Sequence, residues 1–439
     1  MEWFTPFLFG TVLLVGLIFL GCPVGFSMFI TGFLGLGLWV GFPQAFALLS
    51  FDGLYRTPVS FMLLVIPLFI LIAQLIAKSR ATDILYQAFW ELFSGIRGGL
   101  SLATVGMATI LGACIGASIA SVAAMAQLGL EQMLRRNYQK WLAAGSIVGT
   151  GGLAIIIPPS IPAIMYAFVV ELPILDMFAA CLIPGLLLAL GYGAMILILT
   201  GIKPQLAPSG PSLSVGRRVQ AFGQMLPFWG LIVLVLGSIF SGISAITESA
   251  AFGCLAAFLI AWRKGTRQIP FSHILKESGR ETAITTCYLM VIIVGAKYFG
   301  QFWTYTGVID TLSRLIGGIG VSPMIVLLWM NLLLLFLGCL MDAAGIILVV
   351  LPILVAGLKP LGFDPVHIGV IFLVNLEMGL VTPPVGMNLF VFQGVAKSLG
   401  VTYNDTLKGA IPFLLVNGVV LVILAFFPEI SLWLPRKLH

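Results

Sequence analysis

The feature that most constrains this chain is a succession of apolar stretches, each long enough to cross a lipid bilayer. A transmembrane helix needs about 20 predominantly apolar residues to span ~30 Å of hydrocarbon. Only 9% of the 439 residues are charged and 60% are hydrophobic, which excludes an ordinary water-soluble domain. The sequence predicts an all-α polytopic membrane protein, with spans at 7–22, 24–41, 58–77, 177–200, 225–242, 247–262, 282–300 and 409–427.

The positive net charge of +6 could indicate a nucleic-acid partner, but the distribution of the basic residues argues against one. Lys and Arg concentrate in three loops, at 135–140, 203–218 and 263–280. The loops around 171–176 and 242–248 contain neither. By the positive-inside rule the basic loops face the cytoplasm and the other two face outward. The charge therefore sets orientation among membrane lipids, and we expect no nucleic-acid partner.

The chain contains an internal repeat. The motif IPPS at 157–160 returns as TPPV at 382–385, so that Pro158 and Pro383 lie 225 positions apart. Three more pairs of segments keep nearly this spacing: 111–118 with 337–345, 81–89 with 308–316, and 182–190 with 410–418. The number of spans between the halves places the second in the opposite orientation. Inverted-topology repeats with interrupted helices are typical of secondary transporters, whose binding site lies near the bilayer midplane.

A pair of prolines interrupts one predicted helix in each repeat. Proline removes a backbone donor and frees a carbonyl one turn earlier, and an unsatisfied backbone group in hydrocarbon costs several kcal/mol. Such a break is stable only where the freed groups meet protein, water or a ligand. The freed carbonyls suit a small hard cation. A proline kink tolerated by neighbouring helices is the alternative, which the occurrence of the break in both repeats disfavours.

Each broken helix follows a segment rich in small residues that we interpret as a re-entrant hairpin, at 98–130 and 322–355. Small residues would also be explained by close helix packing alone. We expect scaffold helices and an interfacial arm at 1–97 and again at 223–318. The hairpin, broken helix and following span of each repeat occupy 98–200 and 319–430, and a cytoplasmic linker occupies 201–222.

These segments resemble the large membrane (permease) subunit of tripartite ATP-independent periplasmic (TRAP) transporters, the DctM-like family. The resemblance covers nearly the whole chain and rests on LGCPVGFS (20–27), GASIAS (116–121), GTGGLAIIIPPSIPAIMY (149–166), LIPGLLLAL (182–190), GISAITESAAFGCLAAF (242–258), MDAAGIILVVLPIL (341–354) and GLVTPPVGMNLF (379–390). It implies a fold like that of the ion transporter superfamily and Na⁺-coupled import of a small organic acid anion by an elevator movement. It also implies the bacterial inner membrane, a small four-helix membrane subunit and a periplasmic substrate-binding protein.

The residues themselves favour Na⁺ as the coupling ion. Proton coupling needs a side chain in the site that exchanges its proton near neutral pH, and no Asp, Glu, His, Lys or Arg occurs in 111–121 or 149–166. We predict a first Na⁺ site at Ser118, Ser121, Gly149, Thr150, Gly152 and Pro158. A second is predicted at Asp342, Ala344, Gly345, Gly379, Thr382 and Pro383. Asp342 could instead accept backbone N–H groups at the hairpin tip, and Glu377 is either a ligand or a buried hydrogen-bonded carboxylate.

An anionic substrate needs donors near the midplane, where the N-termini of the two half-helices point. The predicted substrate-binding residues are Ser160, Lys297, Asp342 and Asn388. Lys297 could also reach the outer interface with its long side chain.

Three other classes of protein compete with this interpretation. A stand-alone divalent-anion/Na⁺ symporter would share this architecture, and a channel would also tolerate broken helices. An enzyme is disfavoured because His273, His367 and His439 are scattered and form no catalytic cluster.

Overall fold

The computed structural model describes residues 3–48, 58, 60–79, 81–264, 270–318, 320–339, 341 and 343–438, and within these ranges the chain is helical without strands. The helices of the first repeat are α1 (Phe4–Phe19), α2 (Val24–Leu36), α3 (Phe42–Leu48), α5 (Val65–Lys78), α6 (Ala81–Phe93), α7 (Gly99–Ile115), α8 (Ser118–Met125), α9 (Glu131–Arg135), α10 (Lys140–Gly151), α11 (Leu153–Ile156), α12 (Ile161–Val169) and α13 (Ile174–Ile202).

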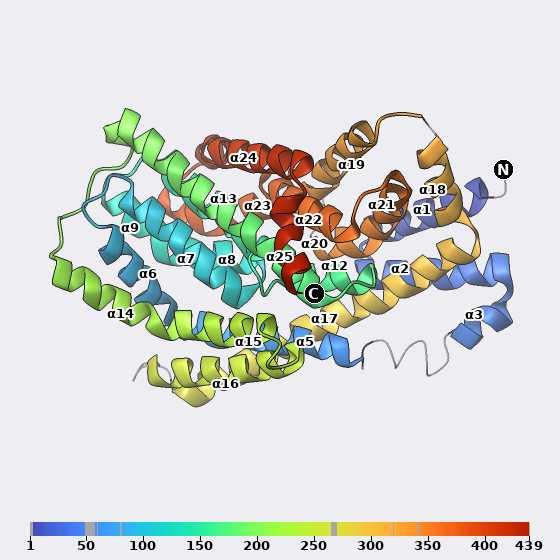
Figure 1. Cartoon of the computed structure of the whole chain (residues 1–439), viewed down its shortest axis with the longest axis horizontal. Coiled ribbons are helices and arrows are strands. Elements are labelled where there is room, and N and C mark those ends of the chain that lie inside the picture. Colours follow the sequence, from blue (N-terminus) through green and yellow to red (C-terminus); the bar gives the residue numbers. More distant parts are fainter. Residues whose placement is uncertain are drawn as a thin grey trace.

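The second repeat follows the linker, and its order of helices matches that of the first: scaffold helices, a short arm helix, a hairpin, a broken helix and a long final helix. Its helices are α14 (Val215–Ile232), α15 (Ser238–Phe240), α16 (Ile246–Lys264), α17 (Phe271–Tyr305), α18 (Val308–Gly318), α19 (Pro323–Gly338), α20 (Ala343–Val349), α21 (Leu351–Leu358), α22 (Pro365–Val381), α23 (Met387–Ala396), α24 (Tyr403–Phe426) and α25 (Glu429–Leu438). In Figure 1 the helices α7 to α13 and α19 to α24 form the centre, while α14 to α17 and α1 to α3 flank it.

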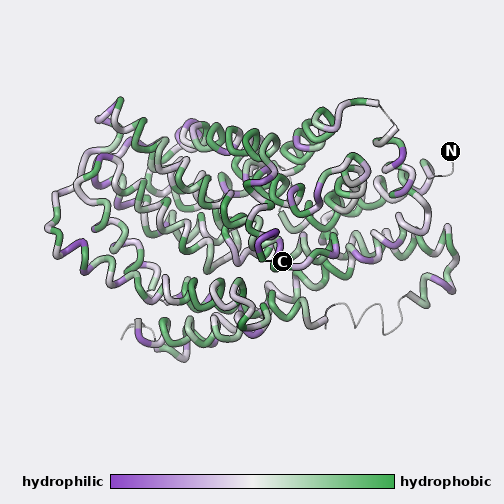
Figure 2. Tube along the Cα trace, viewed as in Figure 1, coloured by the Kyte–Doolittle hydropathy of each residue, from purple (hydrophilic) through white to green (hydrophobic). Residues whose placement is uncertain are grey.

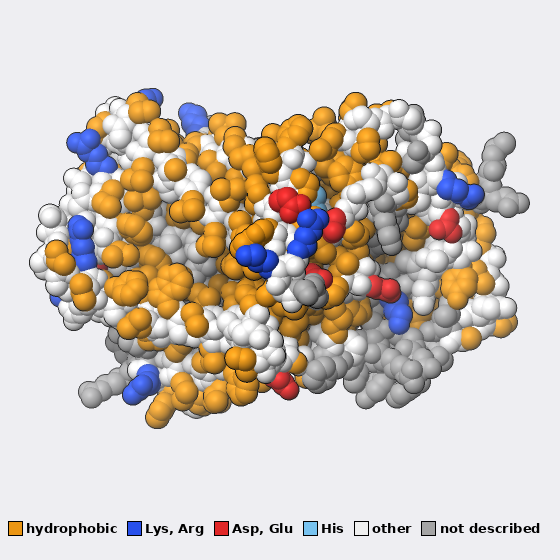
Figure 3. Space-filling view, viewed as in Figure 1, with side chains coloured by type: hydrophobic (Ala, Val, Ile, Leu, Met, Phe, Trp, Pro, Cys, Tyr) orange, Lys and Arg blue, Asp and Glu red, His pale blue; other side chains and the backbone are white. Residues whose placement is uncertain are grey.

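Six continuous helical stretches in the described chain are long and apolar enough to cross a membrane: 24–47, 174–202, 215–240, 246–263, 271–305 and 403–426. Two bent pairs raise the number to eight, 62–78 with 81–93, bent by 70°, and 140–156 with 161–169, bent by 41°. Hydrophobic residues dominate the tube in Figure 2 and the outer face in Figure 3, as lipid contact requires. The predicted polytopic membrane fold is confirmed.

Close backbone approaches between the repeats fix the direction of α24. Gly145 of α10 lies directly against Gly409, and Gly149, one turn later, lies against Phe413. The contact on α24 thus moves from Gly409 to Phe413 as the contact on α10 moves from Gly145 to Gly149, so α10 and α24 run parallel. The absence of a side chain at Gly145 and Gly409 lets the two backbones touch, which no larger residue would allow.

The direction of α13 completes the relation between the repeats. α7 runs parallel to α10 and α11 but antiparallel to α13. Leu100 contacts Tyr138 and Gly112 contacts Ala154, so the residue numbers rise together along α7 and along α10 and α11. Gly98 contacts Thr200 and Leu102 contacts Gly193, so the numbers rise along α7 while they fall along α13. α13 is therefore antiparallel to α24, its counterpart in the second repeat. This opposition confirms that the two repeats are inverted.

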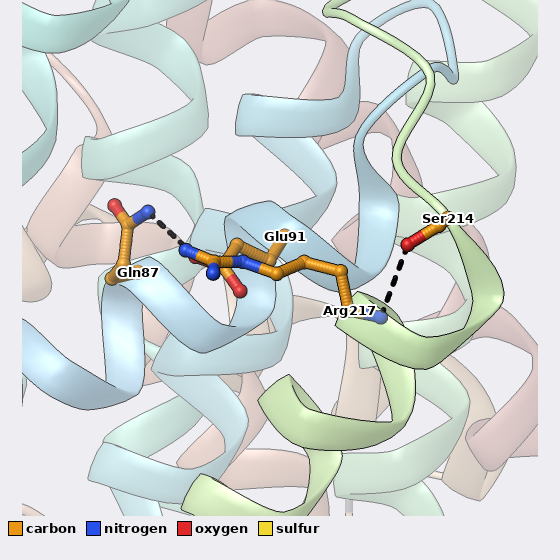
Figure 4. Close-up of polar contacts among 4 residues, drawn as sticks. All are labelled: Gln87, Glu91, Ser214 and Arg217. Carbon is orange, nitrogen blue, oxygen red and sulfur yellow. Dashed lines mark hydrogen bonds and ion pairs between the residues drawn. The ribbon is translucent and has the colours of Figure 1, made fainter.

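The inter-repeat linker is tied to the arm helix α6 by polar contacts (Figure 4). Arg217 Nη2 lies 3.3 Å from Glu91 Oε1, which also accepts a hydrogen bond from Gln87 Nε2 at 3.1 Å. Ser214 caps α14 by accepting a hydrogen bond from the Arg217 backbone N–H at 3.4 Å. These contacts fix the start of the second repeat against the end of the first arm.

The glycine contact between α10 and α24 makes a direct prediction. A Cβ atom at Gly409 would overlap Trp141 O, so Gly409→Ala is expected to destabilise the protein by roughly 1–3 kcal/mol through overpacking. Gly418→Ala on the same helix is the matched control, because no atom lies within 4 Å of its Cβ position. Thermal unfolding in detergent should show a lowered Tm for Gly409→Ala only; equal Tm values would contradict this packing.

Candidate functional site

The tip of the first hairpin abuts the break in the first broken helix. α7 ends at Ile115 and is followed by Gly116, which has φ +61, and α8 begins at Ser118. Gly116 O accepts a hydrogen bond from Ile161 N at 3.3 Å. A Cβ atom at Gly116 would lie 3.0 Å from Pro159 O, so this approach favours glycine. Two non-helical segments therefore satisfy each other's backbone groups inside the protein.

The first hairpin returns to the face from which it starts, as predicted. Leu100 N, in the first turn of α7, donates a hydrogen bond of 3.1 Å to Tyr138 Oη, just after α9. The guanidinium of Arg136 stacks on Trp90 with its carbon 4.1 Å from the ring centroid. Both ends of the hairpin thus lie beside the arm helix α6.

The break itself runs from Ile157 to Ser160 and contains a cis peptide bond between Pro158 and Pro159. Ser160 caps α12, since its Oγ accepts a hydrogen bond from Ala163 N at 3.3 Å. The same hydroxyl donates to Ile155 O. This predicted substrate-binding residue therefore already uses its hydroxyl to join the two half-helices.

The second repeat builds an equivalent junction. Gly386 N donates to Cys339 O at 3.2 Å, and a cis bond joins Pro383 to Pro384. A Cβ atom at Gly338 would lie 2.9 Å from the Cα of Gly379, matching the approach of Gly112 to Ala154 in the first repeat. The breaks predicted from the paired prolines are thus present at both places.

The remaining residues of the predicted second Na⁺ site are only partly described. Asp342 lies outside the described residues, so its predicted roles as Na⁺ ligand, hairpin-tip acceptor and substrate-binding residue stay open. Ala344 and Gly345 form the first turn of α20. Thr382 follows α22, and its Oγ1 donates to Met378 O at 2.6 Å. The lone pairs of this hydroxyl and the backbone carbonyls beside it are the oxygens available to an ion.

The two junctions are joined by a hydrogen bond between repeats. Asn388 Nδ2, on α23, donates to Ser118 Oγ at 2.7 Å, and both side chains are buried. α8 packs against α23, and their counterparts α20 and α12 pack against each other. The predicted Na⁺ residue and the predicted substrate residue are therefore in direct contact.

Two buried oxygens beside this contact have no hydrogen-bond partner in the described chain. They are Ser121 Oγ, one turn after Ser118 on α8, and Asn388 Oδ1. Both residues have 0% exposure. A bare buried oxygen costs about 1–3 kcal/mol unless a donor or cation meets it. The pair thus fits a ligand with positive charge or a hydrogen-bond donor.

The other residues of the predicted first Na⁺ site lie inside α10 or at its end. Thr150 Oγ1 donates to Ser146 O at 2.6 Å. Gly149 is covered by Phe413 and Gly152 by the side chain of Glu377, since a Cβ atom at either glycine would overlap these neighbours. From these two glycines only carbonyl oxygens are available to an ion.

Lys297 lies in a different place from the other candidates. It lines a cavity of about 1030 Å³ between the end of α12 and helix α17, together with Glu171, Thr304 and Leu348. The lining of this cavity includes neither Ser118, Ser160 nor Asn388. The structure therefore brings Ser118 and Asn388 together and places Lys297 apart from them.

A third cluster of buried polar groups lies between the repeats. Tyr192 Oη donates to Glu377 Oε1 at 2.7 Å and lies within hydrogen-bonding reach of Asn417 Oδ1. Glu377 was recognised from the sequence, whereas Tyr192 and Asn417 were not. Their spacing of 225 positions, equal to that of the proline pairs, was the signal that could have identified them.

Comparisons with known proteins agree with this architecture. The family model described as tripartite ATP-independent periplasmic transporter, DctM component, matches residues 11–430. The C4-dicarboxylate TRAP transporter large permease protein DctM of Pseudomonas aeruginosa is 34% identical over 389 residues, which is 88% of each chain. The sialic acid TRAP transporter large permease protein SiaM of Vibrio cholerae is 30% identical, covering 96% of each chain.

A more distant relative and a solved structure complete the comparison. The ectoine/5-hydroxyectoine TRAP transporter large permease protein UehC of Ruegeria pomeroyi is 29% identical, covering 94% of this chain and 95% of its own. The crystal structure of the Alcanivorax borkumensis YdaH transporter superposes with a TM-score of 0.66 at 13% identity and 89% coverage of both chains, a similarity of fold alone. The relatives are transporter permeases, so the chain is no enzyme. The chain belongs to the DctM family, the large permease component of tripartite ATP-independent periplasmic transporters.

Proposed function

We propose that this permease imports a small organic acid anion across the bacterial inner membrane, driven by co-transported Na⁺. The observation that carries the proposal is the pair of equivalent junctions, where Gly116 O meets Ile161 N and Cys339 O meets Gly386 N. At each junction one helix ends at the hairpin tip and another ends at the proline break, and the last carbonyls of these helices have no partner within the helix. Carbonyl and hydroxyl oxygens are the ligands that hard cations prefer.

The first proposed Na⁺ site uses oxygens near Ser118, Ser121 and the backbone of 149–158, and the second uses carbonyls near 343–345 and 379–383. The unpartnered oxygens of Ser121 and Asn388 support the first. The substrate would lie between the sites, where the half-helices α12 and α23 point their N-termini. C4-dicarboxylates are the first substrates to test, because the 34% identical relative carries that name.

The proposed movement is of the elevator type. The hairpins and broken helices of 98–200 and 319–430 interlock through the contacts of α8 with α23 and of α12 with α20. These elements would move as one body against the scaffold of 1–97 and 223–318. The contacts of α5 with α7 and of α17 with α20 cross the proposed sliding boundary.

The match to the DctM family model supports partners over a stand-alone symporter. We propose that a small four-helix membrane subunit completes the membrane complex and that a periplasmic substrate-binding protein delivers the anion. The outward end of α12 and the loop containing Glu171 are candidates for contact with the binding protein.

The coupling ion is tested by uptake into vesicles that contain the chain and its small membrane subunit. Labelled succinate, added with the proposed periplasmic binding protein, should accumulate under an inward Na⁺ gradient. No accumulation is expected with a choline gradient. If the binding protein does not bind succinate, a labelled ligand found by screening that protein replaces succinate in the assay. Uptake driven equally by a proton gradient without Na⁺ would contradict the proposed coupling.

The contact between Ser118 and Asn388 makes a second prediction. Asn388→Ala removes the donor to Ser118 Oγ and the bare oxygen of the amide, so the Na⁺ concentration for half-maximal uptake should rise about tenfold, equivalent to ~1.4 kcal/mol. Gln393→Ala on the same helix removes a hydrogen bond to Thr406, 2.6 Å long, outside the site and serves as the control. An equal rise in both variants would mean that the effect is structural.

A further inference from the structure

The cluster around Glu377 is buried inside the protein. Glu377 on α22 and Tyr192 on α13 have 0% exposure, and Asn417 on α24 has 1%. Glu377 Oε1 accepts the hydrogen bond from Tyr192 Oη at 2.7 Å, whereas Oε2 has no hydrogen-bond partner among the described residues. One oxygen of a fully buried carboxyl group is therefore bare.

The repeat relation places this cluster between the two junctions. Gly152 and Glu377 occupy equivalent positions, 225 residues apart, as do Tyr192 and Asn417. Each residue touches its own equivalent: Glu377 covers Gly152, and Tyr192 Oη faces Asn417 Oδ1. Contact between equivalent positions occurs at the pseudo-twofold axis. The lack of a side chain at Gly152 provides the space that the Glu377 side chain occupies.

The donors of the cluster leave one carboxyl oxygen unmet. The Tyr192 hydroxyl supplies one proton and the Asn417 amide two, yet Glu377 Oε2 receives a hydrogen bond from neither. Reversing the Asn417 amide, whose nitrogen and oxygen are hard to distinguish by position, would give Tyr192 Oη a donor but leave Glu377 Oε2 bare. None of the ion pairs in the described chain includes Glu377. A buried charge without a partner is strongly unfavourable in the membrane interior.

We propose that Glu377, Tyr192 and Asn417 form a third cation site, which binds Na⁺ on the axis between the two junction sites. The carboxylate supplies the compensating negative charge, and the tyrosine and asparagine oxygens supply neutral ligands. Oxygen donors of this kind suit hard cations. The inference rests on the proposed Na⁺ coupling but adds an ion to it. It also gives α13, α22 and α24 a shared ligand, so that Na⁺ binding would hold the two repeats together.

Equilibrium binding of ²²Na⁺ to the purified full-length chain in lipid nanodiscs tests this site without a substrate or partner. Glu377→Gln keeps the size and hydrogen-bonding capacity of the side chain but removes the charge, so it should bind one equivalent of ²²Na⁺ less than wild type. Tyr192→Phe should weaken the binding of the same equivalent. Tyr166→Phe is the matched control, because it removes a buried hydroxyl that donates to Pro365 O at 2.6 Å, away from the cluster.

The outcomes separate this inference from the proposed function. Absence of ²²Na⁺ binding to the wild-type chain would refute the proposed coupling and this site with it. Equal binding by wild type and Glu377→Gln at pH 6 and pH 8 would overturn the third site while leaving Na⁺ coupling in place. If Glu377→Gln fails to fold, the third site is tested by comparing Tyr192→Phe with Tyr166→Phe. Identical ²²Na⁺ titrations of these two variants would overturn the site.

Discussion

The interaction on which this structure depends is the pairing of backbone groups that a membrane helix would normally satisfy within itself. In hydrocarbon a broken helix is tolerated only if other protein groups, water or a ligand meet the freed N–H and C=O groups. Here a carbonyl of each hairpin tip accepts a hydrogen bond from the broken helix beside it, Gly116 O from Ile161 N and Cys339 O from Gly386 N. The tips and breaks are therefore mutually dependent, and neither would be stable in the lipid alone.

The inverted relation of the repeats turns two such junctions into one assembly. α8 packs against α23 and α20 against α12, so each hairpin rests on the half-helix of the other repeat. The hydrogen bond from Asn388 to Ser118 is a polar contact at one of these crossings. Each of these crossings joins the two halves, so the proposed coupling of an ion and a substrate has a direct structural connection between the junctions.

Much of this fold could be predicted because the membrane restricts the possibilities. Apolar length located the six continuous spans, and the repeated proline pairs located both breaks; the span predicted at 7–22 is the 16-residue helix α1, which is shorter than a membrane crossing needs. The candidate sites were less predictable, since side-chain contacts depend on tertiary packing. Ser160 serves as a helix cap as well as a candidate ligand. Lys297 faces a cavity away from Ser118 because α17 carries it past the end of α12. Tyr192 and Glu377 meet because α13 and α22 cross at the axis; the 225-residue spacing marks Tyr192 and Asn417 as equivalent positions but does not determine this contact.

The central claim is that backbone carbonyls freed at the two junctions hold Na⁺. A high-resolution experimental density map of the chain in lipid nanodiscs, recorded once in NaCl and once in choline chloride, tests it most directly. The account predicts an ion-like peak between each hairpin tip and the adjoining proline break in NaCl, and weaker peaks in choline. Straight, unbroken helices through Pro158 and Pro383, or identical density at both junctions in the two salts, would contradict it.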